Sequence, residues 1–169
     1  MSTNQTEIAV TSGPRVLMER PGDRPVTSPE IPHQQLDQIA PAELQEELWR
    51  RMADLDHVRT GASVVSLPET RALHLDPGHA FRPDSAFVRD STEFAHLHGA
   101  RDGSLHALLP EGEAAEVVAK GWGEFHPLVH TGHCPPTLLM VYGPRDPEEL
   151  EVVWDLVRRS HAFAAGQVL

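Results

Sequence analysis

The segment after Pro41 repeats apolar residues at helical spacing. Its apolar positions are Leu44, Leu48, Met52 and Leu55, with Glu and Arg side chains between them. Apolar residues three and four apart share one face of an α-helix, and proline suits a first helical position. The pattern predicts an amphipathic helix of about four turns that begins at Pro41, is ended by Gly61 and covers one face of a sheet.

Three later segments alternate or run apolar as β-strands do. They comprise residues 63–67, 71–75 and 85–88, and turn-forming residues such as Pro68 and Pro77 separate them. Short apolar runs between turn signals are typical of strands that lie side by side. We therefore predict a strand in each of the three segments.

Two more helices and one strand are predicted in the second half of the chain. Residues 111–120 form a short helix stopped by Gly121, and residues 137–142 form an apolar strand. The last helix begins with Asp146 as its cap and Pro147 in its first position. The residues expected to face inward are Ala114, Val117 and Val118 in the first of these helices, and Leu150, Val153, Trp154 and Val157 in the last.

This order of elements predicts an α+β fold. Strands come first and two helices follow late, which favours a two-layer domain with a mainly antiparallel sheet and helices on one face. The other face would be open to a ligand or to a second copy of the chain. Residues 1–32 are rich in Pro, Ser and Thr and predict a flexible arm, so that residues 33–169 form a single domain.

The stretch from Glu93 to Pro127 carries the chemistry of the chain. His96 and His98 are two residues apart, so in a strand they point to the same face. A three-residue turn at 101–103 would pair His98 with His106 across a hairpin and bring three imidazoles together. A two-residue turn is the alternative, and it would send His106 to the opposite face.

A second polar group follows the helix at 111–120. Extended chain there places Glu124 and His126 on one side, from which either can add to the histidine face. His130, His133 and Cys134 lie in the next loop as a weaker group. Nearby imidazoles can activate a thiol, but a partly buried, inert cysteine is the competing interpretation.

Charge and cysteine content narrow the class of protein. The chain has 14 basic and 25 acidic residues, a formal net charge of −11, and one cysteine. Nucleic acids and anionic membranes demand clustered Lys and Arg, so neither is expected as a partner. No internal disulfide can form, and no signal peptide or membrane-spanning run is visible. We expect a cytoplasmic protein.

Three motifs resemble one small family of bacterial and fungal proteins. HLHGARDGSLH, GWGEFHP and VYGPRDPEEL are similar, in this order, to motifs of the "luciferase domain" family, over residues of about 85–165. The resemblance does not by itself imply light emission, and it implies no particular reaction. The positions that it marks include His96, His98, Ser104, His106, Trp122, Glu124, His126, Tyr142 and Arg145.

Three interpretations of the histidine group stay open. Neutral imidazoles of His96, His98, His106 and His126 suit a divalent transition metal such as zinc, iron or copper. Without a metal, Glu124 with His126 or His106 can act as a catalytic acid–base pair. A hydrogen-bonded structural cluster needs neither.

Four further residues are expected to bind substrate. Arg145 precedes a helix start and can hold a carboxylate or phosphate, although an ion pair with a neighbouring acid explains it equally well. Trp122 can line a pocket or belong to the core. The resemblance adds Tyr142 and Ser104.

Our first hypothesis is therefore an enzyme that acts on a small organic molecule, an anionic one included, with His96, His98, His106, Glu124 and His126 as its reactive group. The alternative is a non-catalytic accessory protein that binds a ligand or haem on the same face, with one histidine as axial ligand. A subunit-interaction domain is the third hypothesis.

Overall fold

The computed structural model describes residues 15–81 and 83–167. In this part of the chain, one antiparallel sheet has the strand order β1-β2-β3-β4-β6-β5. The strands are β1 (Val58–Ala62), β2 (Arg71–Leu75), β3 (Glu93–Leu97), β4 (Leu105–Leu108), β5 (Gly123–Phe125) and β6 (Leu138–Val141). The α-helices are α1 (Ala42–Ala53), α2 (Glu111–Ala119) and α3 (Pro147–Ala164), and short 3-10 helices are η1 (Pro77–His79), η2 (Asp84–Ala86) and η3 (Pro127–Thr131). The predicted α+β fold is confirmed.

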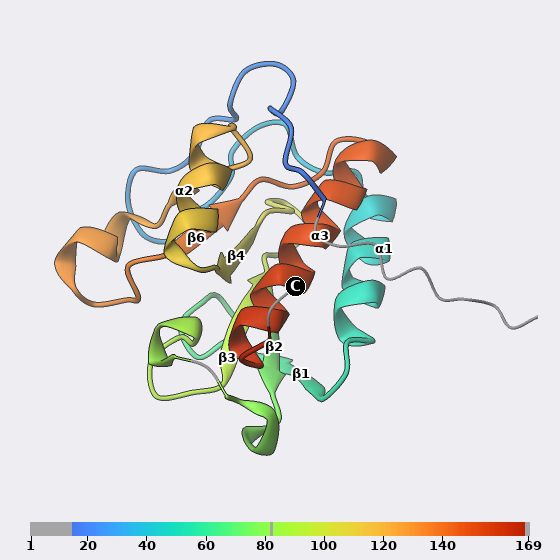
Figure 1. Ribbon diagram of the computed structural model, residues 1–169. Helices are drawn as coiled ribbons and strands as arrows, with labels where there is room; N and C mark the ends of the chain where they lie inside the picture. Colours follow the sequence, from blue (N-terminus) through green and yellow to red (C-terminus); the bar gives the residue numbers. More distant parts are fainter. Residues whose placement is uncertain (1–14, 82, 168–169) are drawn as a thin grey trace, which may run out of the picture.

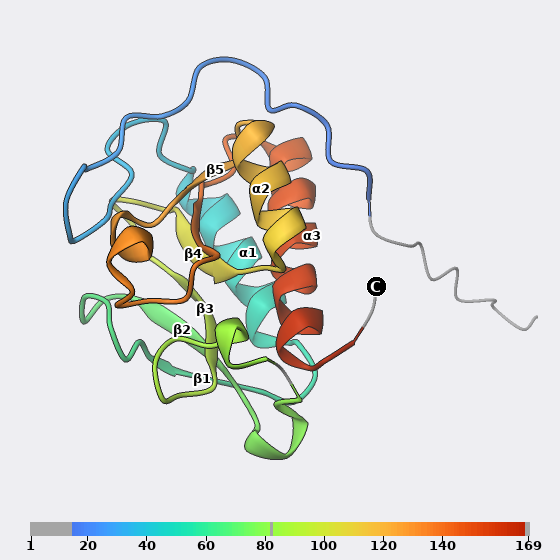
Figure 2. The ribbon, with the colours of Figure 1, turned by 60° about the vertical axis from the view of Figure 1, so that its left-hand side comes forward.

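The helices form one layer on a single face of the sheet (Figures 1 and 2). Alternate residues of the central strands join the core that these helices cover. They are Ala95 and Leu97 on β3, Leu105 and Ala107 on β4, and Leu139 and Val141 on β6. The residues between them, including His96 and His106, point to the opposite face. One face of the sheet thus packs against the helices, and the other carries the histidines.

Helix α1 confirms the predicted apolar stripe but has different ends. Leu48 and Met52 are buried against α3, as the period requires. Pro41 is the residue before the helix, and the helix ends at Ala53. The prediction that Gly61 ends it is wrong, because the chain turns earlier. His57 has a φ of 60°, which no α-helix contains, and Gly61 lies inside β1.

Only one of the three predicted early strands is present. Residues 71–75 form β2, whereas residues 63–67 form a loop and residues 85–88 begin as η2. The loop does not join a ladder, because its Val64 N–H and Ser63 hydroxyl donate to the Glu93 carboxylate at 2.7 and 2.8 Å. The strand predictions at 63–67 and 85–88 are therefore wrong.

The histidine hairpin has the predicted parity but a different register. His106 pairs with His96, not with His98, and Leu105 pairs with Leu97. Because the shift is two residues, His96, His98 and His106 still share one face. The alternative two-residue turn, which sends His106 to the other face, is also wrong.

A five-residue loop at 99–103 causes this shift. The N–H groups of Asp102 and Gly103 both donate to the Gly99 carbonyl, at 3.0 and 3.1 Å. Gly103 then returns the chain to β4 with a φ of 71°, a left-handed conformation that glycine adopts at little cost. The predicted glycine turn is present, but it is longer than the three residues at 101–103.

The described N-terminal segment, residues 15–40, passes from the helix side of the molecule over to the opposite side (Figure 2). Leu17 is buried in the core, and Arg24 donates to the Gly123 carbonyl at 3.0 Å. Residues 1–14 of the predicted flexible arm lie outside the described residues. The domain boundary at residue 32 stays a prediction.

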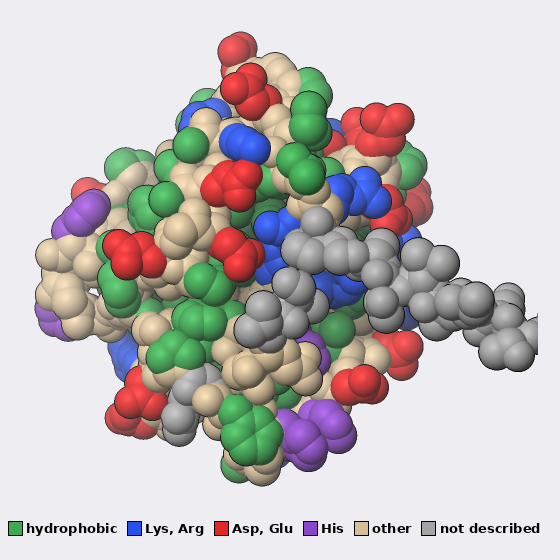
Figure 3. Space-filling view, in the orientation of Figure 1, with side chains coloured by type: hydrophobic (Ala, Val, Ile, Leu, Met, Phe, Trp, Pro, Cys, Tyr) green, Lys and Arg blue, Asp and Glu red, His purple; other side chains and the backbone are tan. Residues whose placement is uncertain are grey.

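The surface carries charges of both signs. On the face shown in Figure 3, Asp and Glu side chains are spread among Lys and Arg side chains. None of the helices in the described part of the chain is long and apolar enough to cross a membrane.

Candidate functional site

A row of paired residues crosses the face of the sheet that the helices leave open. Glu124 on β5 pairs with Met140 on β6, and Met140 pairs with His106 on β4. His106 pairs in turn with His96 on β3. Paired residues point to the same face, and neighbouring strands are about 4.8 Å apart. Glu124 therefore shares a face with the histidines but is two strands away from His106, too far for a direct hydrogen bond.

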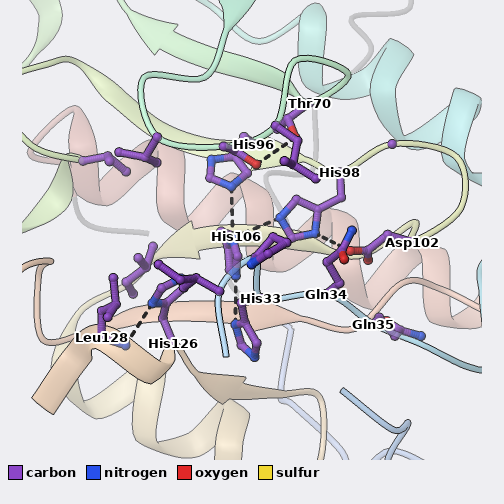
Figure 4. A pocket seen from close by; sticks show the side chains of 18 of the residues that line it. His33, Gln34, Gln35, Thr70, His96, His98, Asp102, His106, His126 and Leu128 are labelled. Carbon is purple, nitrogen blue, oxygen red and sulfur yellow. Dashed lines mark hydrogen bonds and ion pairs between the residues drawn. The ribbon is translucent and has the colours of Figure 1, made fainter. Parts of the chain in front are cut away.

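Three imidazole rings converge at the centre of this face (Figure 4). Nε2 of His96 and Nε2 of His98 each lie 3.0 Å from Nδ1 of His106. All three side chains are buried. These three nitrogens are close enough together to bind one metal ion.

A carboxylate lies behind His96. Its Nδ1–H donates to Oε1 of Glu93 at 2.6 Å, and Glu93 is fully buried. Residues three apart in a regular strand point to opposite faces. A β-bulge at Phe94 removes this conflict, because Leu73 pairs with Ala95 while the next residue of β2 pairs with Glu93. The bulge thus brings Glu93 to the histidine face.

A second carboxylate lies behind His98. Its Nδ1–H donates to the Ser104 hydroxyl oxygen at 3.1 Å and lies 2.9 Å from Oδ2 of Asp102. The Ser104 hydroxyl donates in turn to the other oxygen of Asp102. The predicted substrate-binding residue Ser104 therefore orients His98.

His33 from the N-terminal segment connects His106 to Glu124. Nδ1 of His33 lies 3.1 Å from Nε2 of His106, and Nε2 of His33 donates to Oε1 of Glu124 at 2.7 Å. Thr27 and Tyr142 donate their hydroxyls to the same carboxylate, at 2.8 and 2.9 Å. The buried His33 ring thus spans the gap that Met140 leaves between the two strands.

His126 lies beside this cluster, and its hydrogen-bond partner is a backbone N–H group. Its ring packs edge-on against His106 and His33, with centroids 5.0 and 5.2 Å apart. Nδ1 of His126 accepts from the Leu128 N–H at 3.1 Å, at the start of η3. Burial and the neighbouring histidines lower the pKa of His126 to about 4, so the ring is neutral near pH 7.

Electrostatics favour the neutral form of His96, His106 and His126 and the ionised form of the three carboxyl groups. Burial, followed by the surrounding histidines, holds the pKa of His106 well below its ordinary value. Burial also lowers the pKa of His96, against the opposing effect of Glu93. For Glu93, Asp102 and Glu124, burial opposes ionisation, but hydrogen bonds from histidines and hydroxyls outweigh it and lower the pKa of each carboxyl.

The cluster opens into a cavity of about 990 Å³. Five histidines of the cluster line it: His33, His96, His98, His106 and His126. Apolar side chains make up much of the rest, among them Leu36, Leu67, Val88, Leu128 and Leu138. Arg89 and Arg101 are its basic lining residues. Sites for small organic molecules commonly combine apolar walls with a few convergent polar groups.

The structure brings most of the predicted residues together. His96, His98 and His106 meet directly, His126 lies beside them, and Glu124 is connected through His33. Tyr142 does not line the cavity but holds Glu124. Their roles in catalysis and metal binding stay predictions.

Arg145 and Trp122 lie elsewhere. Arg145 donates to Glu149 at 2.9 Å and to the Pro21 carbonyl at 2.7 Å. The bond to Glu149 is the ion pair that was the alternative interpretation of this residue. Trp122 is buried in the core and donates to the Met18 carbonyl at 2.6 Å. Neither residue lines the cavity.

The loop after β5 contributes two of its three predicted residues. His133 and Cys134 line the cavity, whereas His130 is exposed. Burial raises the pKa of the Cys134 thiol, which argues against an activated thiolate. His74 and His79 do not line the cavity.

Sequence reasoning missed three residues of this site. They are His33, Glu93 and Asp102. A histidine directly after the predicted arm was the available signal for His33, and acids flanking His96 and His98 were the signal for the other two. Buried metal-site histidines commonly donate to carboxylates, so these acids deserved testing as partners.

Comparison with known proteins identifies relatives of the chain. Residues 91–160 match the model of a family described as "Luciferase domain". A luciferase from Armillaria ostoyae is 32% identical over 87% of this chain and 60% of its own length. A luciferase from Armillaria mellea is 30% identical over the same shares. One from Neonothopanus nambi is 42% identical over 63% of this chain and 39% of its own length.

The chain spans about 60% of the length of the Armillaria relatives. No solved structure is significantly similar to it. The matched residues contain His96, His98, His106, Glu124 and His126, so the histidine cluster lies mostly within the shared region. Over residues 91–160 the chain is similar to the luciferase-domain family.

Proposed function

We propose that this chain is a metal-dependent enzyme that acts on a small organic molecule, with His96, His98 and His106 as the metal ligands. One observation carries the proposal. Each of the three rings has a hydrogen-bonding partner on its outer side, and the inner nitrogens converge, with Nε2 of His96 and Nε2 of His98 each 3.0 Å from Nδ1 of His106.

The outer acceptors decide the tautomers of His96 and His98. Glu93 is ionised and can only accept, so the proton of His96 is on Nδ1. The Ser104 hydroxyl gives its own proton to Asp102, so it accepts from Nδ1 of His98. In both neutral rings Nε2 is then unprotonated and points toward Nδ1 of His106.

The hydrogen bonds from His106 through His33 to Glu124 determine which nitrogen of His106 carries the proton. Glu124 accepts from Nε2 of His33, which leaves Nδ1 of His33 as an acceptor in the neutral ring. That nitrogen takes the Nε2–H of His106, and the lone pair of His106 is then on Nδ1. The reverse arrangement would require protons on both ring nitrogens of His33, and we assign the arrangement with one.

A divalent cation bound by all three inner nitrogens would remove the repulsion between their lone pairs. Zinc binds imidazole at about 2.0–2.1 Å, which puts two ligands of a tetrahedral site about 3.4 Å apart, close to the 3.0 Å contacts of His106. Iron and copper also suit imidazole. Three protein ligands leave a coordination position for water or substrate, and the cavity offers the space.

The surroundings support catalysis on a small molecule. The apolar walls fit an organic substrate, and Arg89 and Arg101 suit an anionic one. A bound metal would supply Lewis-acid or redox chemistry, while the chain itself orients the ligands. Relatives named luciferase carry the name of an enzyme, which favours catalysis over the accessory role.

Metal analysis of protein purified without a histidine tag tests the proposal. We expect about one zinc, iron or copper per chain, and loss of that metal in His98→Ala. His130→Ala is the matched control, because His130 is an exposed histidine. Equal metal content in wild type and His98→Ala would contradict the ligand assignment, and a Soret band would favour the haem-binding alternative.

A further inference from the structure

We propose that the cavity contains an anion-binding position between the three-histidine metal site and the Nε2–H group of His126. The inference rests on the proposed metal site and goes beyond it. The ligand is a small anion, or an anionic oxygen atom of the substrate, that occupies the open coordination position. His126 is then a hydrogen-bond donor and not a metal ligand.

The bond from Leu128 fixes the proton of His126. A nitrogen that accepts the Leu128 N–H carries no proton, so the neutral ring has its proton on Nε2. His33, His106 and His126 lie close enough for a shared metal ion. However, coordination through Nε2 would require that proton to leave, and coordination through Nδ1 would break the bond at the start of η3.

The position of the ring leaves the Nε2–H free for a ligand. His126 lines the same cavity as the three proposed ligands, edge-on to His106. Among the described residues, none accepts a hydrogen bond from Nε2 of His126. A neutral N–H group beside a cation is suited to an anion that the metal already holds.

Charges along the cavity agree with an anionic ligand. Arg89 and Arg101 line the cavity, opposite in sign to such a ligand. Of the lining carboxylates, Asp102 is occupied by Ser104 and His98, which leaves Glu69. Arg89 and Arg101 match the two lining carboxylates in number and give an anion two cationic positions in a chain whose net charge is −11.

Azide binding to Co(II)-loaded protein tests the inference. Co(II) absorption reports both metal binding and the addition of azide. We expect His126→Ala to bind Co(II) within about threefold of wild type but to weaken azide binding by roughly 10-fold to 100-fold, as for a hydrogen bond to a charged group. His126→Gln, which restores an N–H donor, should recover most of the azide affinity.

His133→Ala is the matched control, since His133 lines the same cavity and, within residues 15–81 and 83–167, its ring bonds only Thr131. Its azide affinity should equal that of wild type. Unchanged azide affinity in His126→Ala would overturn the inference, and so would a loss of Co(II) affinity, which would make His126 a ligand. Failure of wild type to bind Co(II) would instead overturn the proposed function, and the anion position with it.

Discussion

Nε2 of His96 and Nδ1 of His106 lie 3.0 Å apart on directly paired residues of neighbouring strands. The residues on either side of this pair, Ala95 with Ala107 and Leu97 with Leu105, are buried under the helices. The core therefore fixes the backbone that carries the two rings. A site on paired strands is held more firmly than one built on loops, as a metal centre requires.

The histidine cluster should make the metal-free protein unstable in mild acid. The pKa values of His96, His106 and His126 are all lowered in the folded state, that of His126 to about 4. Below the ordinary value of about 6.5 the unfolded chain takes up protons that the folded chain does not. The free energy of unfolding in urea, with a chelator present, should fall from pH 7 toward about pH 4.

His126→Gln isolates one part of this effect. The variant should show a shallower loss of stability over the same pH range, because one histidine with a lowered pKa is gone. His130→Gln removes an exposed histidine of the same η3 segment and should keep the wild-type profile. Identical profiles for wild type and His126→Gln would show that His126 does not couple folding to protons.

His33 should control metal affinity without binding the metal. Its ring holds the proton of His106 and passes the bond on to Glu124, so its loss frees the His106 tautomer. We expect His33→Ala to weaken zinc binding by roughly 10-fold to 100-fold, measured in competition with a chromophoric chelator. Gln34→Ala, a neighbour that also lines the cavity, should bind zinc as wild type does. Equal zinc affinities for wild type, His33→Ala and Gln34→Ala would argue against a role of His33 in orienting His106.

Glu93 should matter for both metal binding and stability. Glu93→Gln removes the charge that orients His96 and weakens the bonds from Ser63 and the Val64 N–H. We expect zinc affinity to fall by roughly 10-fold to 100-fold and the free energy of unfolding by about 1–3 kcal/mol. Glu69→Gln changes a glutamate that lines the cavity and should leave zinc affinity unchanged. A neutral effect of Glu93→Gln on zinc binding would contradict the tautomer assignment.

Gly103 should be required for the hairpin that carries His98. A Cβ at this left-handed position would lie 2.8 Å from Nε2 of Gln45, and the backbone conformation alone costs about 1–2 kcal/mol. Gly103→Ala should therefore lower the free energy of unfolding by at least that amount. Gly112→Ala in α2 meets no atom within 4 Å and should be neutral or stabilising. Thermal melts of both variants compare them directly, and equal melting temperatures would refute the argument.

Local signals predicted much of the fold correctly. Asp146 caps α3 and accepts from the Glu149 N–H at 2.8 Å, as the cap pattern indicates. The apolar periods of α1 and α2, the shared face of His96 and His98, and the stop at Gly121 followed from spacing alone. Each of these features depends on residues that are near one another in the sequence.

The remaining features depend on distant or irregular contacts. Three- and five-residue loops both end in a left-handed glycine, so Gly103 did not distinguish the two registers. The odd spacing of Glu93 and His96 implies opposite faces unless a bulge is known. His33 lies far upstream in a segment without periodicity, and only tertiary structure connects it to His106.

Anomalous diffraction from a crystal of the metal-loaded protein tests the central claim most directly. We predict one strong peak about 2.0–2.2 Å from Nε2 of His96, Nε2 of His98 and Nδ1 of His106. A strong peak at another group of residues, such as His57, Asp76 and His79, with none among the three imidazoles, would contradict it.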